Sequence, residues 1–253
     1  MVFTPIEQNR TSQEVEAQIE MLVLEGVLRG GDKLPGEREL SKSLNVSRPI
    51  LRQAIAALAD KGLLVTRHGE ATLVADVIGT IFAAPVAKLI GENVKAKMDY
   101  LEYRREIEGL AAAMAAQRAT EADRTLLTRI ANDMRAAHAA KDAALEARID
   151  VEFHNAIVDA AHNIVLLHTL RSCYRLLSED VFFNRQVLYD RGGMRRKLLD
   201  QHIAIYDAIM ARDANAATET ARAHIVFVIE VQEELQKSRT RDVVSEKRLE
   251  ARG

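Results

Sequence analysis

The sequence is short of several features that mark other classes of protein. It has a single cysteine, Cys173, no tryptophan and only 4% aromatic residues among 253. A lone cysteine excludes an internal disulfide framework and is typical of a reducing compartment. The longest segments without Asp, Glu, Lys or Arg, residues 77–87 and 160–170, have 11 residues each, whereas a membrane span needs roughly 18. The N-terminus lacks the pattern of a secretory signal, so we expect a cytoplasmic protein without membrane contact.

The chain also lacks an excess of either charge. Its 35 basic and 37 acidic residues give a net charge of -2, which by itself argues against a nucleic-acid partner. The charges are unevenly distributed, however, because residues 38–68 contain six basic and two acidic side chains, whereas residues 7–37 contain three basic and seven acidic ones. A short basic block is expected at a focused DNA contact. Charge alone is explained more simply by a solvated helix face.

The chain divides into two regions of different amino-acid composition. Three of the four prolines lie in the first 75 residues, and long Ala- and Leu-rich helical patterns follow. We therefore predict a mainly α protein, with a small mixed domain followed by an all-helical bundle. The predicted boundaries are 1–75 for the first domain, 76–95 for a linker or first helix, 96–236 for the helical domain and 237–253 for a charged tail. The tail lacks an apolar stripe, so we expect it to be frayed or disordered.

The first domain shows the element order of a winged helix-turn-helix. Thr11 and Glu14 form a capping-box pair at the start of an amphipathic helix that is predicted to reach about residue 29. A short helix, a turn at Asn45, a longer helix and a β-prone hairpin follow. Their predicted ranges are 37–44 for the short helix, 47–61 for the longer helix and 63–74 for the hairpin.

Two arginines, Arg48 and Arg52, stand at the start of the longer helix. In a helix-turn-helix, the first residues of the second helix meet base edges and phosphates in the major groove. The arginines are four residues apart, so both guanidinium groups project from one face and can each grip a guanine edge or a phosphate. Ser47 can cap this helix, but Pro49 disfavours a helical Arg48, so we expect the helix to begin at Pro49.

Two segments of this domain carry a family resemblance, LPGERELSKSLNVSRPILRQAIAALADKGLL (34–64) and RHGEATLV (67–74). They resemble the GntR family of bacterial transcription regulators. The resemblance implies DNA contacts by Arg38, Ser47, Arg48 and Arg52 and, at the wing tip, by His68 and Gly69. Gly36 departs from the usual capping serine or alanine. Glu70 and Ala71 replace the usual second wing glycine, and a glutamate there would repel phosphate.

Polar side chains interrupt the apolar stripes of the helical domain. Asp150 and His154 are four residues apart on one predicted helix, and His202 and His224 lie on apolar faces of two later ones. His202 precedes Asp213 by 11 residues and His224 follows it by 11, so both sit roughly 16 Å from a turn, at one level of an antiparallel hairpin. Three imidazoles and one carboxylate suit zinc, or manganese or nickel. The alternative is that each is a separately satisfied core residue.

The helical domain carries a second resemblance, in YRREIEGLAAAMAAQRAT, DVEFHNAIVDAAHN and QHIAIYDAIMARD. These segments resemble the FCD effector domain of the FadR branch of the same family. The resemblance implies a divalent metal ion, most simply zinc, held by Asp150, His154, His202 and His224. It also implies an effector contact by Arg104, for which a local pair with Glu108 is an equal alternative, and a weaker one by Asn163. The segment AAHNIVLLHTLRSCYRLLSEDVFFNRQVLY looks most like lactate- and glycolate-responsive members, which favours a small hydroxycarboxylate.

These patterns predict a dimeric DNA-binding transcription regulator and not an enzyme. One recognition helix reads only a few base pairs, so a homodimer should bind a palindromic operator in double-stranded DNA. We expect a small carboxylate effector bound at the metal to control operator affinity, with repression relieved by the effector as the first expectation and activation as the alternative. Two alternatives stay open: a metal-dependent enzyme acting on a small carboxylic acid, and a regulator with a purely structural metal site.

Overall fold

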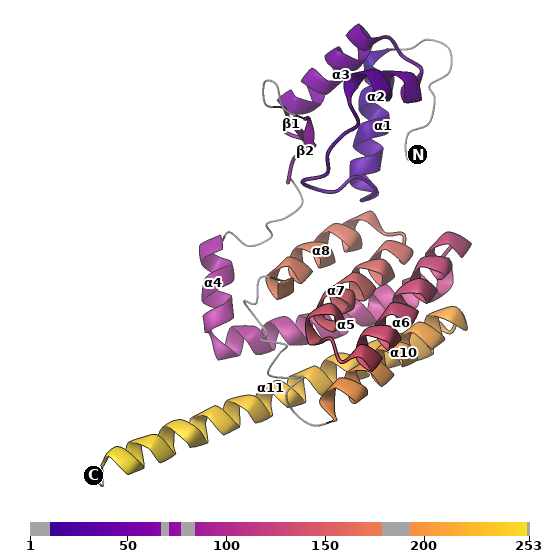
Figure 1. Cartoon of the computed structure of the whole chain (residues 1–253). Helices are drawn as coiled ribbons and strands as arrows, with labels where there is room; N and C mark the ends of the chain where they lie inside the picture. Colours follow the sequence, from indigo (N-terminus) through magenta and orange to yellow (C-terminus); the bar gives the residue numbers. More distant parts are fainter. Residues whose placement is uncertain (1–10, 67–70, 77–83, 179–192, 252–253) are drawn as a thin grey trace. The chain divides into compact units, whose positions relative to one another are not determined.

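The computed structural model describes residues 11–66, 71–76, 84–178 and 193–251 (Figure 1). The chain separates into two compact units, Met1–Ile81 and Phe82–Gly253. The first unit has the winged helix-turn-helix order and the second is built from helices, so the fold class predicted from the sequence is confirmed. The helices of the described residues include none that is long and apolar enough to cross a membrane.

The first unit consists of three helices and a short hairpin. Its elements are α1 (Ser12–Leu24), α2 (Glu37–Leu44), α3 (Arg48–Asp60), β1 (Leu64–Val65) and β2 (Leu73–Val74). The two strands are antiparallel, with Leu64 opposite Val74. The predicted capping box at Thr11 and Glu14 is present at the start of α1. The predicted length of α1 was wrong, because the helix ends at Leu24 and Gly26 then takes a φ of +66° that turns the chain.

The turn between α2 and α3 places the recognition helix. Asn45 adopts the left-handed conformation with a φ of 56°, which stops α2. α3 begins at Arg48 and not at Pro49 as predicted, with Ser47 at the N-cap position. A proline is tolerated at the second helical position because the first N–H groups of a helix have no intrahelical acceptor. Leu51 and Leu58 of α3 are buried, and α3 packs against α1, which orients the exposed face of the helix.

The second unit is a bundle of helices, and short capped turns lead into α6, α7 and α11. Its described helices are α4 (Ala84–Glu92), α5 (Val94–Arg118), α6 (Glu121–Ala140), α7 (Ala143–Ala160), α8 (Ile164–Ser178), α10 (Met194–Met210) and α11 (Ala214–Glu250). Thr120, Asp142 and Asp213 accept hydrogen bonds from backbone N–H groups at the starts of α6, α7 and α11. These caps satisfy donors that the helices leave unpaired, so the chain can reverse within a few residues.

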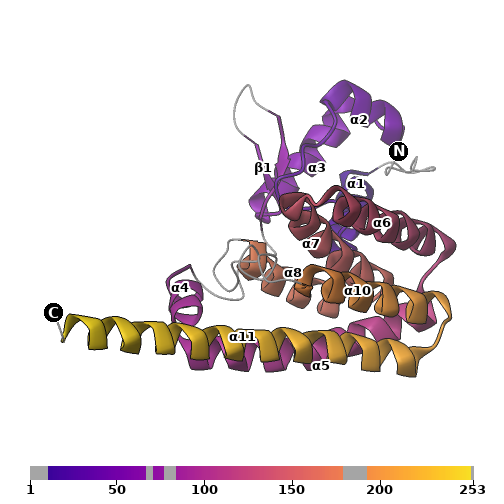
Figure 2. The ribbon, with the colours of Figure 1, turned by 60° about the horizontal axis from the view of Figure 1, so that its bottom comes forward.

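α5 and α11 lie side by side over much of the length of α5 (Figure 2). The close approach depends on Gly109, where an added Cβ would lie 3.1 Å from Cγ of Arg222. α11 also continues to Glu250, so the expectation of a frayed tail beyond residue 237 was wrong for the described part. The tail is exposed, and its Lys, Arg and Glu residues have high helix propensity and need no packing to stay solvated.

Candidate metal centre and DNA-reading face

Three buried histidines from three helices meet in the core of the second unit. His154 comes from α7, His202 from α10 and His224 from α11. One ring nitrogen of each lies within 4.8 Å of the other two. The ring centres of His202 and His224 are 4.4 Å apart, so the sequence prediction that these two residues share one level of a helical hairpin is confirmed.

The spacing of these atoms fits a tetrahedral metal ion. Nε2 of His202 lies 3.3 Å from Nε2 of His154 and 3.2 Å from Oδ1 of Asp150. Two nitrogens bound to one zinc ion at about 2.0–2.1 Å would be about 3.3–3.4 Å apart at the tetrahedral angle. Without a cation between them, two facing ring nitrogens can be satisfied only if one carries a proton. The three predicted histidines are thus brought together, and the fourth predicted ligand, Asp150, contacts His202. These donor types suit such an ion.

Two further residues orient the imidazoles. Nδ1 of His154 lies 3.0 Å from Oε2 of Glu108, and Nδ1 of His224 lies 3.1 Å from Oε1 of Gln201. An oxygen acceptor at Nδ1 favours the tautomer with its proton there, which leaves the Nε2 lone pair for a metal ion. The sequence analysis missed both roles. Glu108 was considered only as a local partner of Arg104, although its place on the same buried helix face was a usable signal.

The electrostatic surroundings of the cluster shift the pKa values of Glu108 and of His224. Burial alone would raise the pKa of Glu108, but Arg104 and then His154 outweigh that effect and hold the pKa at about 2. Burial lowers the pKa of His224 well below its usual value, and His202 and His154 lower it further. Only a neutral imidazole offers a lone pair to a metal ion. The centre therefore combines the ionised carboxylate of Glu108, which contacts His154, with a neutral His224.

Arg104 is buried and takes part in the local pair that the sequence left open. Its Nε donates to Oε1 of Glu108 at 2.5 Å. The guanidinium carbon lies 5.9 Å from the ring centre of Tyr100 and 5.6 Å from that of Tyr174, within range of cation–π attraction. Since Glu108 also contacts His154, Arg104 is linked to the histidine cluster through one carboxylate. The pair with Glu108 accounts for a buried arginine without requiring an effector.

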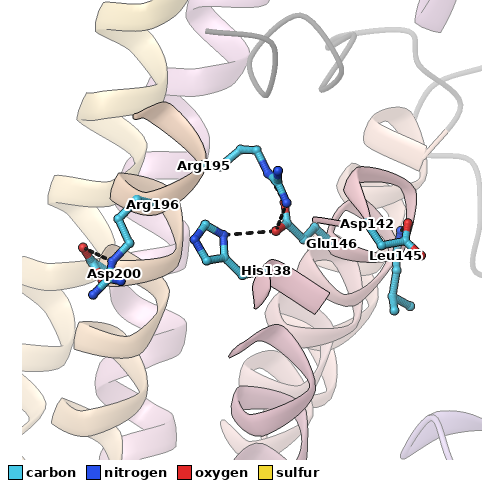
Figure 3. A network of polar contacts seen from close by, with 7 residues as sticks. All are labelled: His138, Asp142, Leu145, Glu146, Arg195, Arg196 and Asp200. Atoms are coloured by element: carbon cyan, nitrogen blue, oxygen red, sulfur yellow. Dashed lines mark hydrogen bonds and ion pairs between the residues drawn. The ribbon is translucent and has the colours of Figure 1, made fainter. Parts of the chain in front are cut away.

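A second polar network is built around Glu146, which lies one helical turn before Asp150 on α7. Figure 3 shows His138 of α6 and Arg195 of α10 directed at the carboxylate of Glu146. Arg195 donates through Nη2 at 2.7 Å and through Nε at 3.0 Å, and Nδ1 of His138 lies 3.1 Å from Oε1. A cavity of about 20 Å³ is lined by these three residues together with Asp150 and His202. That volume holds about one water molecule. Because the same small cavity is lined by residues of both groups, the network borders the histidine cluster.

The remaining candidates of the helical domain have other partners. Asn163 accepts a hydrogen bond from the backbone N–H of Leu166 at 3.1 Å, which caps the start of α8. Its amide nitrogen lies 4.0 Å from the sulfur of Met114. These contacts explain Asn163 as a helix cap. His162 lies 2.8 Å from a carboxylate oxygen of Asp123 and is partly exposed, away from the three clustered histidines.

The DNA-reading face of the first unit is exposed. Arg38, Ser47, Arg48 and Arg52 all lie at the surface, with Arg38 on α2 and the others at the start of α3. Glu37, which the sequence analysis did not single out, contacts both Arg48 and Arg52. His68 and Gly69, the predicted wing tip, lie outside the described residues. The structure therefore presents four of the six predicted DNA contacts on neighbouring helices.

Two family descriptions match the chain. "Bacterial regulatory proteins, gntR family" matches residues 11–74, and "FCD domain" matches residues 99–227. A solved structure, Streptococcus agalactiae GntR, covers 87% of this chain and 99% of its own with a TM-score of 0.53 and 23% identity, which supports the fold alone.

Curated relatives extend over both units. A protein of Escherichia coli (strain K12) named for regulation of the L-lactate dehydrogenase operon is 36% identical over 223 residues, 87% of this chain and 85% of the relative. The Glc operon transcriptional activator of the same strain is 34% identical and covers 87% and 88%. HTH-type transcriptional regulator LutR of Bacillus subtilis (strain 168) is 29% identical and covers 83% and 95%. These relatives are named as regulators and not as enzymes. The chain therefore belongs to the GntR family of bacterial transcription regulators and carries an FCD domain.

Proposed function

We propose that this transcription regulator binds a palindromic operator as a homodimer and that a small hydroxycarboxylate at a metal centre controls its operator affinity. The observation that carries the proposal is the convergence of three histidine nitrogens inside the FCD domain, with the Asp150 carboxylate in contact with one of them, on His202. A buried group of this kind is costly unless something pairs with it. A divalent cation is the simplest partner for it.

Four residues would hold the ion, and the chain orients two of them. Asp150, His154, His202 and His224 are the proposed ligands, with zinc as the first choice and manganese or nickel as alternatives. When bound, the ion would supply positive charge and open coordination positions to a carboxylate oxygen. Arg104 would contact the end of the effector that does not bind the metal ion. It would use its terminal nitrogens, since its Nε already donates to Glu108.

Exposed apolar side chains support dimerisation through the second unit. Tyr103 and Leu110 of α5 are 42% and 45% exposed, and Val226 on the adjacent α11 is 38% exposed. We expect light scattering coupled to size exclusion to give about twice the chain mass of 28.2 kDa at micromolar concentration. Leu110→Glu should shift this mass toward the monomer, because it buries a charge in the contact. A monomeric mass for the unchanged protein would contradict the homodimer.

The effector is expected among small hydroxycarboxylates, since relatives carry names that refer to lactate dehydrogenase and Glc operons. Calorimetry of the zinc-loaded protein with lactate, glycolate, pyruvate and citrate should give saturable binding to at least one. That compound should also weaken operator binding, because an effector shifts a two-state protein only if it binds one state better. Saturable binding that leaves operator affinity unchanged would contradict the proposed control. The absence of measurable binding for all four compounds would favour a purely structural metal site.

A further inference from the structure

The two arginines at the start of α3 converge on one carboxylate from α2. Nε of Arg52 donates to both carboxylate oxygens of Glu37, at 3.0 Å to Oε1 and 2.9 Å to Oε2. Nη2 of Arg48 lies 3.5 Å from Oε2 of the same residue. The three side chains remain accessible, at 64% for Arg52, 56% for Arg48 and 37% for Glu37. An anionic group thus stands beside the cations proposed to contact DNA.

The pairing engages only part of the Arg52 guanidinium. A guanidinium has one N–H at Nε and four at its two terminal nitrogens. Both hydrogen bonds from Arg52 to Glu37 use Nε, so the terminal nitrogens keep the edge that can form two parallel hydrogen bonds with guanine. Because Glu37 holds the side chain in one arrangement, less rotamer freedom is lost when the edge meets a base.

We propose that Glu37 is a specificity-determining positioning residue that aligns Arg52, and more weakly Arg48, for base reading. Alignment increases affinity only where a base offers matching acceptors. The negative charge of Glu37, in contrast, weakens attraction to every phosphate backbone. Alignment therefore raises the ratio of specific to non-specific DNA affinity, whereas the charge lowers both affinities alike and leaves that ratio unchanged. The inference goes beyond effector control, and it rests on the proposed DNA contacts of Arg48 and Arg52.

A second glutamate on α2 allows the effect of position to be separated from that of charge. Glu37 and Glu39 both lie in the first turn of α2, where a carboxylate interacts favourably with the helix N-terminus. Glu39 is exposed and, among the described residues, forms no ion pair with Arg48 or Arg52. Glu39→Gln therefore removes the same charge from the same helical turn without removing a contact to either arginine.

The test compares two duplexes and four variants of the full chain without effector. One duplex is selected by the unchanged protein from a random-sequence pool, and the other is its shuffled version. Fluorescence anisotropy measures both affinities for Glu37→Gln, Glu39→Gln, Arg52→Ala and the double variant Glu37→Gln/Arg52→Ala. Glu37→Gln should lower the ratio of the two affinities by about five- to tenfold, as expected for a weakened bidentate base contact. Glu39→Gln should tighten both complexes alike and leave the ratio unchanged.

The double variant shows whether Glu37 acts through Arg52. In the Arg52→Ala background, Glu37→Gln should no longer change the ratio, because the interaction that it supports is already absent. Equal behaviour of Glu37→Gln and Glu39→Gln would overturn the inference and leave Glu37 as a simple surface charge. An unchanged ratio for Arg52→Ala alone would instead contradict the proposed DNA contact. Thermal melting of each variant verifies that the fold is retained.

Discussion

Removal of the proposed metal ion by EDTA is expected to lower the thermal midpoint of the protein by about 5–10 °C. A ligand present at one hundred times its Kd stabilises the folded state by about 2.7 kcal/mol, and each kcal/mol shifts the midpoint of a chain of this size by roughly 2–4 °C. The effect should be large because the ligands come from α7, α10 and α11, so the ion would join three helices. Circular dichroism before and after chelation, and after added zinc, measures it.

His202→Ala is expected to reduce zinc affinity by at least about 100-fold. Loss of a residue that only orients a ligand costs 10–100-fold, and His202 contacts both His154 and Asp150 through Nε2. Elemental analysis and competition with a zinc indicator measure metal content and affinity. His162→Asn is the control, because His162 lies apart from the cluster and Asn tolerates its φ of 46°. Stoichiometric metal in His202→Ala would refute the four-ligand assignment, and a midpoint unaffected by EDTA would refute the stabilising role.

Arg48→Ala is expected to weaken binding to the selected duplex by about 1–3 kcal/mol, the range for a bidentate contact between arginine and a base. Arg48 is exposed at the first position of α3, where a recognition helix meets base edges. Binding to shuffled DNA should fall much less, because loss of one positive charge removes about one phosphate contact at most. Anisotropy titrations at several salt concentrations separate the two effects.

A charge-matched control belongs with this experiment. Arg129 is exposed on α6 of the second unit and is not among the predicted DNA contacts, and Arg129→Ala removes the same charge. We expect it to leave discrimination between the two duplexes unchanged. If Arg48→Ala and Arg129→Ala give the same small loss on both duplexes, Arg48 contributes only general electrostatic attraction and does not read a base.

Most of the fold could be predicted from local patterns. The capping box at Thr11 and Glu14, the range of α2 and the hairpin that joins α10 to α11 follow from signals within a few residues of one another. The predicted start of α3 and end of α1 were wrong by a few residues, because several backbone conformations are acceptable at a helix end. The prediction of a frayed tail was wrong because the absence of an apolar stripe indicates only that a segment does not pack against a core. It does not exclude a helix.

The proposed metal ligands could be predicted because helix geometry relates their positions in the sequence. Asp150 and His154 share a face, and the equal distances of His202 and His224 from Asp213 place them together. The contacts of Glu108 with His154, of Gln201 with His224 and of Glu37 with Arg48 and Arg52 were not predicted, because each joins residues of two different helices. Nothing in the local sequence states which neighbouring helix a glutamate or glutamine will face.

The sequence alone determined the helical class, and it predicted the recognition helix with its arginines and the four donors of the candidate metal centre. The helices and the pairs within them depend on residues three or four apart, whose geometry is the same in any helix. The pairing of His202 with His224 depends instead on their equal distances from Asp213. Only the tertiary structure decided that Glu108 links Arg104 to His154 and that Glu37 stands between Arg48 and Arg52. Such contacts arise from the packing of separate helices, where shifts of a few ångströms change which side chains meet.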